Sequence, residues 1–131
     1  MTATTGVDRQ LSGAANGTQR ADRVLSNPLC ADPNPGCWFN PAAFAQPAPG
    51  TLGNAGRASL PGPGFWDIAA AVSRIFRIQE NMNVEARVEA FNLTNSYRAG
   101  IPITAINNQN FGKILTAQDP RILQLALKFV F

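Results

Sequence analysis

Three segments of the chain alternate between apolar and other side chains, which is the periodicity of a β-strand with one apolar face. In residues 65–78, Arg74 interrupts an otherwise apolar face made of Trp66, Ile68, Ala70, Val72, Phe76 and Ile78. In residues 83–95, Glu85, Arg87 and Glu89 lie opposite the row Val84, Ala86, Val88 and Ala90. In residues 121–131, one face carries Leu123, Leu125, Leu127, Phe129 and Phe131. The pattern therefore predicts three long strands.

The second of these segments also admits a helix, because Ala, Glu and Arg are good helix formers. At helical spacing its charges would spread around the cylinder instead of sharing one side, so a strand is favoured. The polar run QENMN at 79–83 then predicts a short turn between the first two strands, with a pairing that sets Arg77 opposite Glu85.

The remaining segments are rich in turn-forming residues. Residues 1–64 are predicted to be mostly irregular, and residues 96–119 form a second long loop. Cys30 and Cys37 enclose a short Pro- and Gly-containing segment, which suits a disulfide in an oxidising compartment; two free thiols are the alternative. Nearby, Trp38, Phe39 and Phe44 either contact a substrate or pack the loop, and packing is favoured.

Strand length separates two architectures with this alternation. A β-sandwich is built mostly from strands of about five or six residues, whereas membrane-spanning strands run to about 9–11. Trp66, Phe129 and Phe131 lie at strand ends, where membrane barrels place aromatic girdles. The sequence therefore favours an all-β, antiparallel transmembrane β-barrel; a secreted or surface β-sandwich binding module is the alternative.

Composition limits the chemistry. Charged residues make up only 15% of the 131 residues, and basic side chains are scattered, which argues against nucleic-acid binding. There is no histidine and there are only two cysteines, so the usual zinc sites and histidine-dependent catalytic pairs cannot form within the chain. We expect neither enzymatic activity nor a metal or other cofactor.

Targeting signals give a second expectation. The first 24 residues do not have the pattern of a secretory signal, and no apolar run is long enough for a membrane-spanning helix. The chain is therefore expected to be either cytoplasmic or a piece of a longer, exported protein.

One family resemblance joins these features. The run WFNPAAFAQPAPGTLGNAGRASLPGPGFWDIAAAVSRIFRI, followed by EAFNLTN, NFGKI and DPRILQLALKFVF, resembles the C-terminal end of TonB-dependent outer-membrane receptors. It is most similar to the Oar-like type that carries a carboxypeptidase-regulatory-like domain, known from Acidobacteria. The resemblance covers residues 5–131 and implies import of a bulky nutrient.

The resemblance also implies an arrangement in the outer membrane. Residues 65–131 would supply the last three strands, with residues 1–64 and 96–119 as extracellular loops and QENMN as a periplasmic turn. The last strand would face lipid and be similar to the signal read by the barrel-assembly machinery. The plug domain and the segment that contacts TonB would lie outside this chain. A receptor has about 22 strands, so the chain is expected to be a fragment or a truncated gene product.

The charged residues of the strands would then face the barrel lumen. Their role is either contact with substrate or plug, or a structural charge ladder between strands, and the ladder is favoured. These residues are Arg77, Glu85, Arg87, Glu89 and Lys128.

Overall fold

The computed structural model describes residues 1–13 and 19–131, and these divide into two compact units. The loop unit comprises Met1–Pro63 and Ala99–Ala117, and the strand unit comprises Gly64–Arg98 and Gln118–Phe131. Most of the predicted loop at 96–119 packs with the N-terminal part of the chain.

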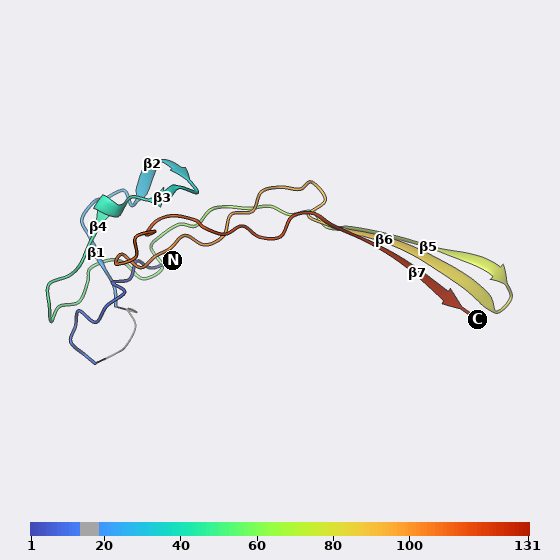
Figure 1. The fold of residues 1–131 in the computed structure, drawn as a ribbon, viewed down its shortest axis with the longest axis horizontal. Helices are drawn as coiled ribbons and strands as arrows, with labels where there is room; N and C mark the ends of the chain where they lie inside the picture. The colour runs from blue at the N-terminus through green and yellow to red at the C-terminus, as the bar shows by residue number, and fades with distance from the viewer. Residues whose placement is uncertain (14–18) are drawn as a thin grey trace. The chain divides into compact units, whose positions relative to one another are not determined.

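The strand unit is an antiparallel sheet of three strands in the order β5–β6–β7 (Figure 1). They are β5 (Ala70–Gln79), β6 (Met82–Phe91) and β7 (Ile122–Val130). This confirms the predicted all-β antiparallel class. The strands are shorter than the predicted segments 65–78, 83–95 and 121–131, with 10, 10 and 9 residues.

The turn between β5 and β6 is tighter than the sequence predicts. Only Glu80 and Asn81 lie outside the two strands, and a register shift between Arg77 and Gln79 marks a bulge. Arg77 consequently pairs with Asn83, and the predicted opposition of Arg77 and Glu85 is wrong. A shorter turn combined with one extra residue on β5 moves the register, because every pairing in a hairpin is counted from its turn.

The far end of β6 is set by asparagine. Asn92 has φ +50° and Asn95 has φ +51°, a left-handed conformation that asparagine tolerates better than most residues. The Asn92 side-chain oxygen accepts a hydrogen bond from the Ser96 N–H at 2.9 Å, which fixes the bend. The chain therefore turns away after Phe91, and the pairing becomes irregular beyond β5, where the Leu93 N–H donates to the Ile68 carbonyl oxygen at 2.9 Å.

Short elements form the loop unit. β1 (Asp22–Arg23) pairs with β4 (Phe44–Ala45), and β2 (Leu29–Asn34) pairs with β3 (Cys37–Phe39). The 3-10 helix η1 (Pro41–Ala43) joins β3 to β4. Asn40 caps this turn by accepting a hydrogen bond from the Ala42 N–H at 3.0 Å, and proline is well suited to the first helical position.

The loop unit has its own apolar core despite this sparse secondary structure. The ring of Phe44 packs edge-on against that of Phe111 at a centroid distance of 5.4 Å, and Phe39 lies 6.4 Å from the same ring. Phe39 and Phe44 therefore pack inside the loop unit and are not exposed to a ligand. The buried apolar residues of the core are Ala3, Ala21, Phe39, Ala43, Phe44, Leu60 and Phe111.

Gly112 shows how closely the second loop segment approaches this core. Its carbonyl oxygen accepts hydrogen bonds from the N–H groups of Trp38 (2.8 Å) and Phe39 (3.2 Å). Its φ is +76°, and a Cβ at this position would lie 2.3 Å from the Phe39 carbonyl oxygen. A glycine is therefore required here by both backbone conformation and space.

Candidate membrane interface

The register of the β5–β7 sheet gathers the apolar positions of all three strands on one face. Val88 lies between Val72 and Leu125, and the neighbouring rungs follow the same rule because side chains alternate along each strand. We call this surface the apolar face. Its members are Ala70, Val72, Arg74, Phe76, Val84, Ala86, Val88, Ala90, Leu123, Leu125, Leu127 and Phe129.

The row contributed by β7 is the most exposed part of the apolar face. Leu125 and Leu127 are 82% and 80% exposed, and the following Phe131 is 92% exposed. The Phe129 and Phe131 rings lie 5.8 Å apart, so the terminal residue continues this row. A contiguous surface of large apolar side chains is unfavourable in water, but it is what a strand in contact with hydrocarbon requires.

The opposite surface, here called the polar face, carries the charges of the sheet apart from Arg74. Glu85 is paired in register with Lys128 on β7 and with Ile75 on β5. Arg87 makes an ion pair with Glu89 along the same strand, at 2.5 Å between Nη2 and Oε1. Four of the five candidate lumen charges therefore lie on β6 or directly beside it: Glu85, Arg87, Glu89 and Lys128. Arg77 lies nearer the hairpin end, opposite Asn83.

The Glu85–Lys128 rung predicts a measurable charge effect. Replacing Lys128 with glutamate sets two carboxylates opposite each other, and we expect this to lower the stability of the folded barrel by about 0.2–1 kcal/mol. The double variant Glu85→Lys/Lys128→Glu restores an opposite-charge pair and is expected to recover most of the loss. Urea-unfolding midpoints of the two variants check this; equal losses in both would contradict a pairwise interaction.

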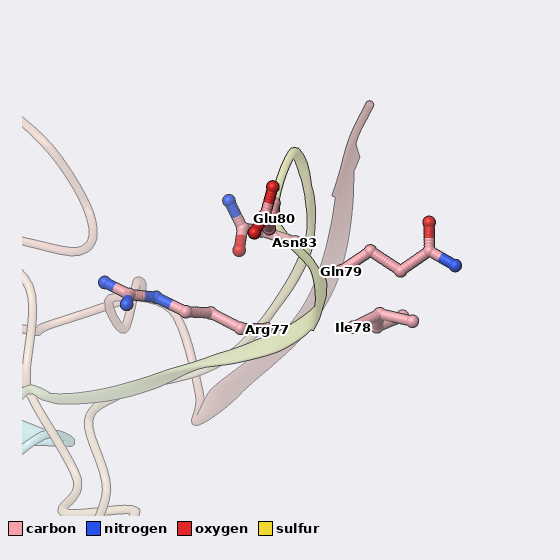
Figure 2. A pocket seen from close by; sticks show the side chains of 5 residues that line it. All are labelled: Arg77, Ile78, Gln79, Glu80 and Asn83. Carbon is pink, nitrogen blue, oxygen red and sulfur yellow. The ribbon is translucent and has the colours of Figure 1, made fainter.

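A shallow hollow lies at the hairpin end of the sheet. Its lining residues are Arg77, Ile78, Gln79, Glu80 and Asn83, and Figure 2 shows the Arg77 side chain extending away from those of Ile78 and Gln79. These side chains diverge and come from an exposed turn. The hollow therefore lacks the converging polar groups of a binding site.

The loop unit contains the other predicted feature, the cysteine pair. A disulfide joins Cys30 to Cys37 across the β2–β3 hairpin, with 6.0 Å between the Cα atoms. The covalent link ties together the ends of a solvent-exposed turn. It also holds β3, whose last residue is the buried Phe39, against β2.

Asp8 is the group in the loop unit whose acidity the structure changes. The hydrogen bond from the Gln19 side-chain amide lowers the pKa of Asp8, and the N–H groups of Ser12 and Gly13 act in the same direction. Desolvation is the second-largest influence and raises the pKa, but the hydrogen bonds together outweigh it. Because the folded pKa is depressed, this carboxylate favours the folded loop above its ordinary pKa, and the contribution disappears as the pH falls through the lowered value.

One set of contacts in the strand unit gave no signal in the sequence. The Arg98 guanidinium forms an ion pair with Asp67 at 3.2 Å and donates a second hydrogen bond to the Asp119 carbonyl oxygen at 2.9 Å. These bonds join the segments that lead into β5 and β7. The three residues are far apart along the chain, so no local pattern relates them.

Two other kinds of site are absent from the residues that the structure describes. Outside residues 14–18, no three His, Cys, Asp or Glu side chains are grouped so that they could hold a metal ion. The described part of the chain also contains no helix long and apolar enough to cross a membrane.

Comparison with known proteins identifies the class. A family model described as an outer membrane beta barrel domain matches residues 1–124. Because that match spans most of the chain, the chain belongs to this family, and it is a protein of the bacterial outer membrane. Neither the comparison with curated proteins nor that with solved structures finds a significant match. The family, together with the exposed apolar face, favours the barrel over the sandwich alternative.

Proposed function

We propose that the chain forms part of a TonB-dependent receptor of the Oar-like type, whose complete form imports a bulky nutrient across the outer membrane. One observation carries this proposal: an antiparallel sheet with a continuous exposed apolar face is joined to a compact loop unit with its own core. Long strands combined with large ordered loops are typical of ligand-gated outer-membrane transporters, and the resemblance of residues 5–131 names this type.

The proposed orientation follows from the lengths of the two connections. β5 and β6 are joined by two residues, whereas β6 and β7 are joined through the segment that contributes Ala99–Ala117 to the loop unit. Outer-membrane barrels have short periplasmic turns and long extracellular loops. The hairpin is therefore periplasmic. The end of β7 lies on the same side, because Val130 pairs with Asn83 next to the hairpin.

The two faces of the sheet then have different partners. The apolar face contacts lipid, with Leu123, Leu125, Leu127 and Phe129 as the row on β7, and the polar face lines the barrel interior. Within the described residues β5 and β7 each pair along one edge only. An unpaired edge in hydrocarbon costs several kcal/mol for each unsatisfied backbone group, so further strands must close the barrel.

The remaining partners come from the proposed class. Closing the barrel and inserting it require the barrel-assembly machinery, and we propose β7 together with the following Phe131 as the segment that this machinery recognises. The plug and the TonB-contacting segment belong to other parts of the receptor. The charges of the polar face act as a structural ladder, and the protein acts as a transporter that has no cofactor or catalytic residue.

The proposed contact between the receptor and TonB is tested by cross-linking. Outer membranes of the source bacterium are mixed with a purified periplasmic TonB domain that carries a photo-activated cross-linker, and antibody against residues 30–60 detects the product. We expect a heat-modifiable band well above 14.0 kDa that gains the mass of the TonB domain on illumination. A TonB domain with a scrambled contact segment is the control.

The outcomes separate the two levels of the proposal. A heat-modifiable band that does not cross-link would leave an outer-membrane barrel of another transport class and reject the TonB-dependent receptor. A band of 14.0 kDa in the soluble fraction would reject both.

A further inference from the structure

Arg74 is the one charged residue on the apolar face. Its neighbours in the register are Ala86 on β6 and, one strand further, Leu127 on β7. Neither ion pair of the described residues involves it. Its guanidinium carbon instead lies 5.5 Å from the centroid of the Phe76 ring, which is two residues nearer the hairpin on the same face.

The position of Arg74 is costly for a lipid-facing charge. A lipid-facing arginine costs about 2–4 kcal/mol at the bilayer midplane and about 0–1 kcal/mol near the interface. Phe76 and Phe129 belong to one rung, next to the end of β7. Arg74 lies about 5 Å further into the membrane than this aromatic rung, given about 3.3 Å per residue and a strand tilt of about 40°.

The direction of the Arg74 side chain reduces this energetic cost. An arginine can extend along an apolar surface and place its charged end at the interface. The contact with Phe76 shows that the Arg74 guanidinium points towards the hairpin end, which is the nearer membrane boundary. In the proposed orientation the charge therefore lies closer to the periplasmic boundary than the Arg74 backbone does, with its apolar stem over the strand.

We propose that Arg74 and Phe76 form a binding site for a glycerophospholipid of the periplasmic leaflet, in which the guanidinium binds the lipid phosphate. The proposal rests on the lipid-facing orientation proposed above. The occupant is defined by charge and shape: a guanidinium matches a phosphate through paired hydrogen bonds. The acyl chains of the same lipid cover the adjacent Val72 and Leu127, which are 70% and 80% exposed.

A comparison of two lipids tests the proposal without any mutation. The intact barrel that carries these strands is purified in a nonionic detergent and titrated with phosphatidylglycerol or with diacylglycerol of the same chains, and bound lipid is counted by native mass spectrometry. The two lipids differ in the phosphoglycerol headgroup. We expect phosphatidylglycerol to bind about tenfold more tightly, the ratio for one charge-assisted contact.

Two variants then assign the preference to one residue. Arg74→Gln is expected to remove the tenfold preference while leaving diacylglycerol binding unchanged. Arg77→Gln is the matched control, because it removes the same charge near the same end of β5 but on the polar face, and it is expected to keep the preference. Heat-modifiable migration verifies that each variant is folded before titration.

The outcomes distinguish this site from the orientation on which it rests. Equal binding of both lipids to the wild type, or an unchanged preference in Arg74→Gln, would reject the phosphate site and leave the lipid-facing assignment intact. If neither lipid binds the wild type, both the site and the lipid-facing assignment are rejected.

Discussion

Replacing Leu125 with lysine is expected to reduce the yield of folded barrel sharply and to lower its stability by about 2–4 kcal/mol, the cost of a lipid-facing lysine at mid-membrane. Leu125 is 82% exposed on the apolar face and lies near the middle of β7, one rung farther from the hairpin than Arg74, so the new charge has no protein group to cover it. The fraction of heat-modifiable protein in isolated outer membranes measures the yield, and urea unfolding in lipid vesicles measures the stability.

The same strand offers a matched control. Gln124→Lys places an identical charge on the polar face, where Glu89 is its partner in the register. We expect this variant to assemble like the wild type, because an opposite-charge pair across two strands is neutral or slightly stabilising. Equal losses in Leu125→Lys and Gln124→Lys would mean that the apolar face does not contact lipid, and the proposed orientation would be wrong.

Replacing Phe39 with alanine is expected to destabilise the loop unit by about 3–5 kcal/mol, the range for removing a fully buried phenylalanine. Its side chain has no solvent exposure and belongs to the core cluster with Phe44 and Phe111. In hydrogen-exchange experiments on the folded barrel, we expect the amides of Trp38 and Ile114 to exchange at least about a hundredfold faster.

Leu52→Ala is the control for this variant. Leu52 belongs to the same unit but is 66% exposed, so its truncation removes little buried surface and is expected to change stability by less than about 0.5 kcal/mol. The strand unit has hydrogen-bonded ladders of its own, and its amides are expected to keep their protection in both variants. Unchanged exchange in Phe39→Ala would show that the aromatic cluster does not hold the loop unit together.

If the chain is part of the proposed receptor, the core of the loop unit has a physical role there. An extracellular loop that buries its own core and carries a disulfide presents a fixed surface, so binding a ligand there costs less conformational entropy than ordering a flexible loop. The hydrogen bonds of Gly112 to the backbone of β3 join the two sequence segments that build this surface.

The sequence by itself determined the strands and their faces. Alternation with a period of two is a local property, because successive side chains of an extended chain point to opposite sides whatever the partner strand. The row from Leu123 to Phe129 and the opposing charges of β6 could therefore be assigned before any fold was known. The absence of histidine limited the chemistry in the same direct way.

Tertiary structure decided the features that depend on where distant segments meet. Arg77 pairs with Asn83 because a two-residue turn and a bulge set the register. The alternation of side chains does not determine the length of the turn, so it cannot give the register. Phe111 and Gly112 read as part of a polar loop, yet they complete the core around Phe39. Such contacts form only when the whole chain folds, since the burial that stabilises them comes from residues far apart in the sequence.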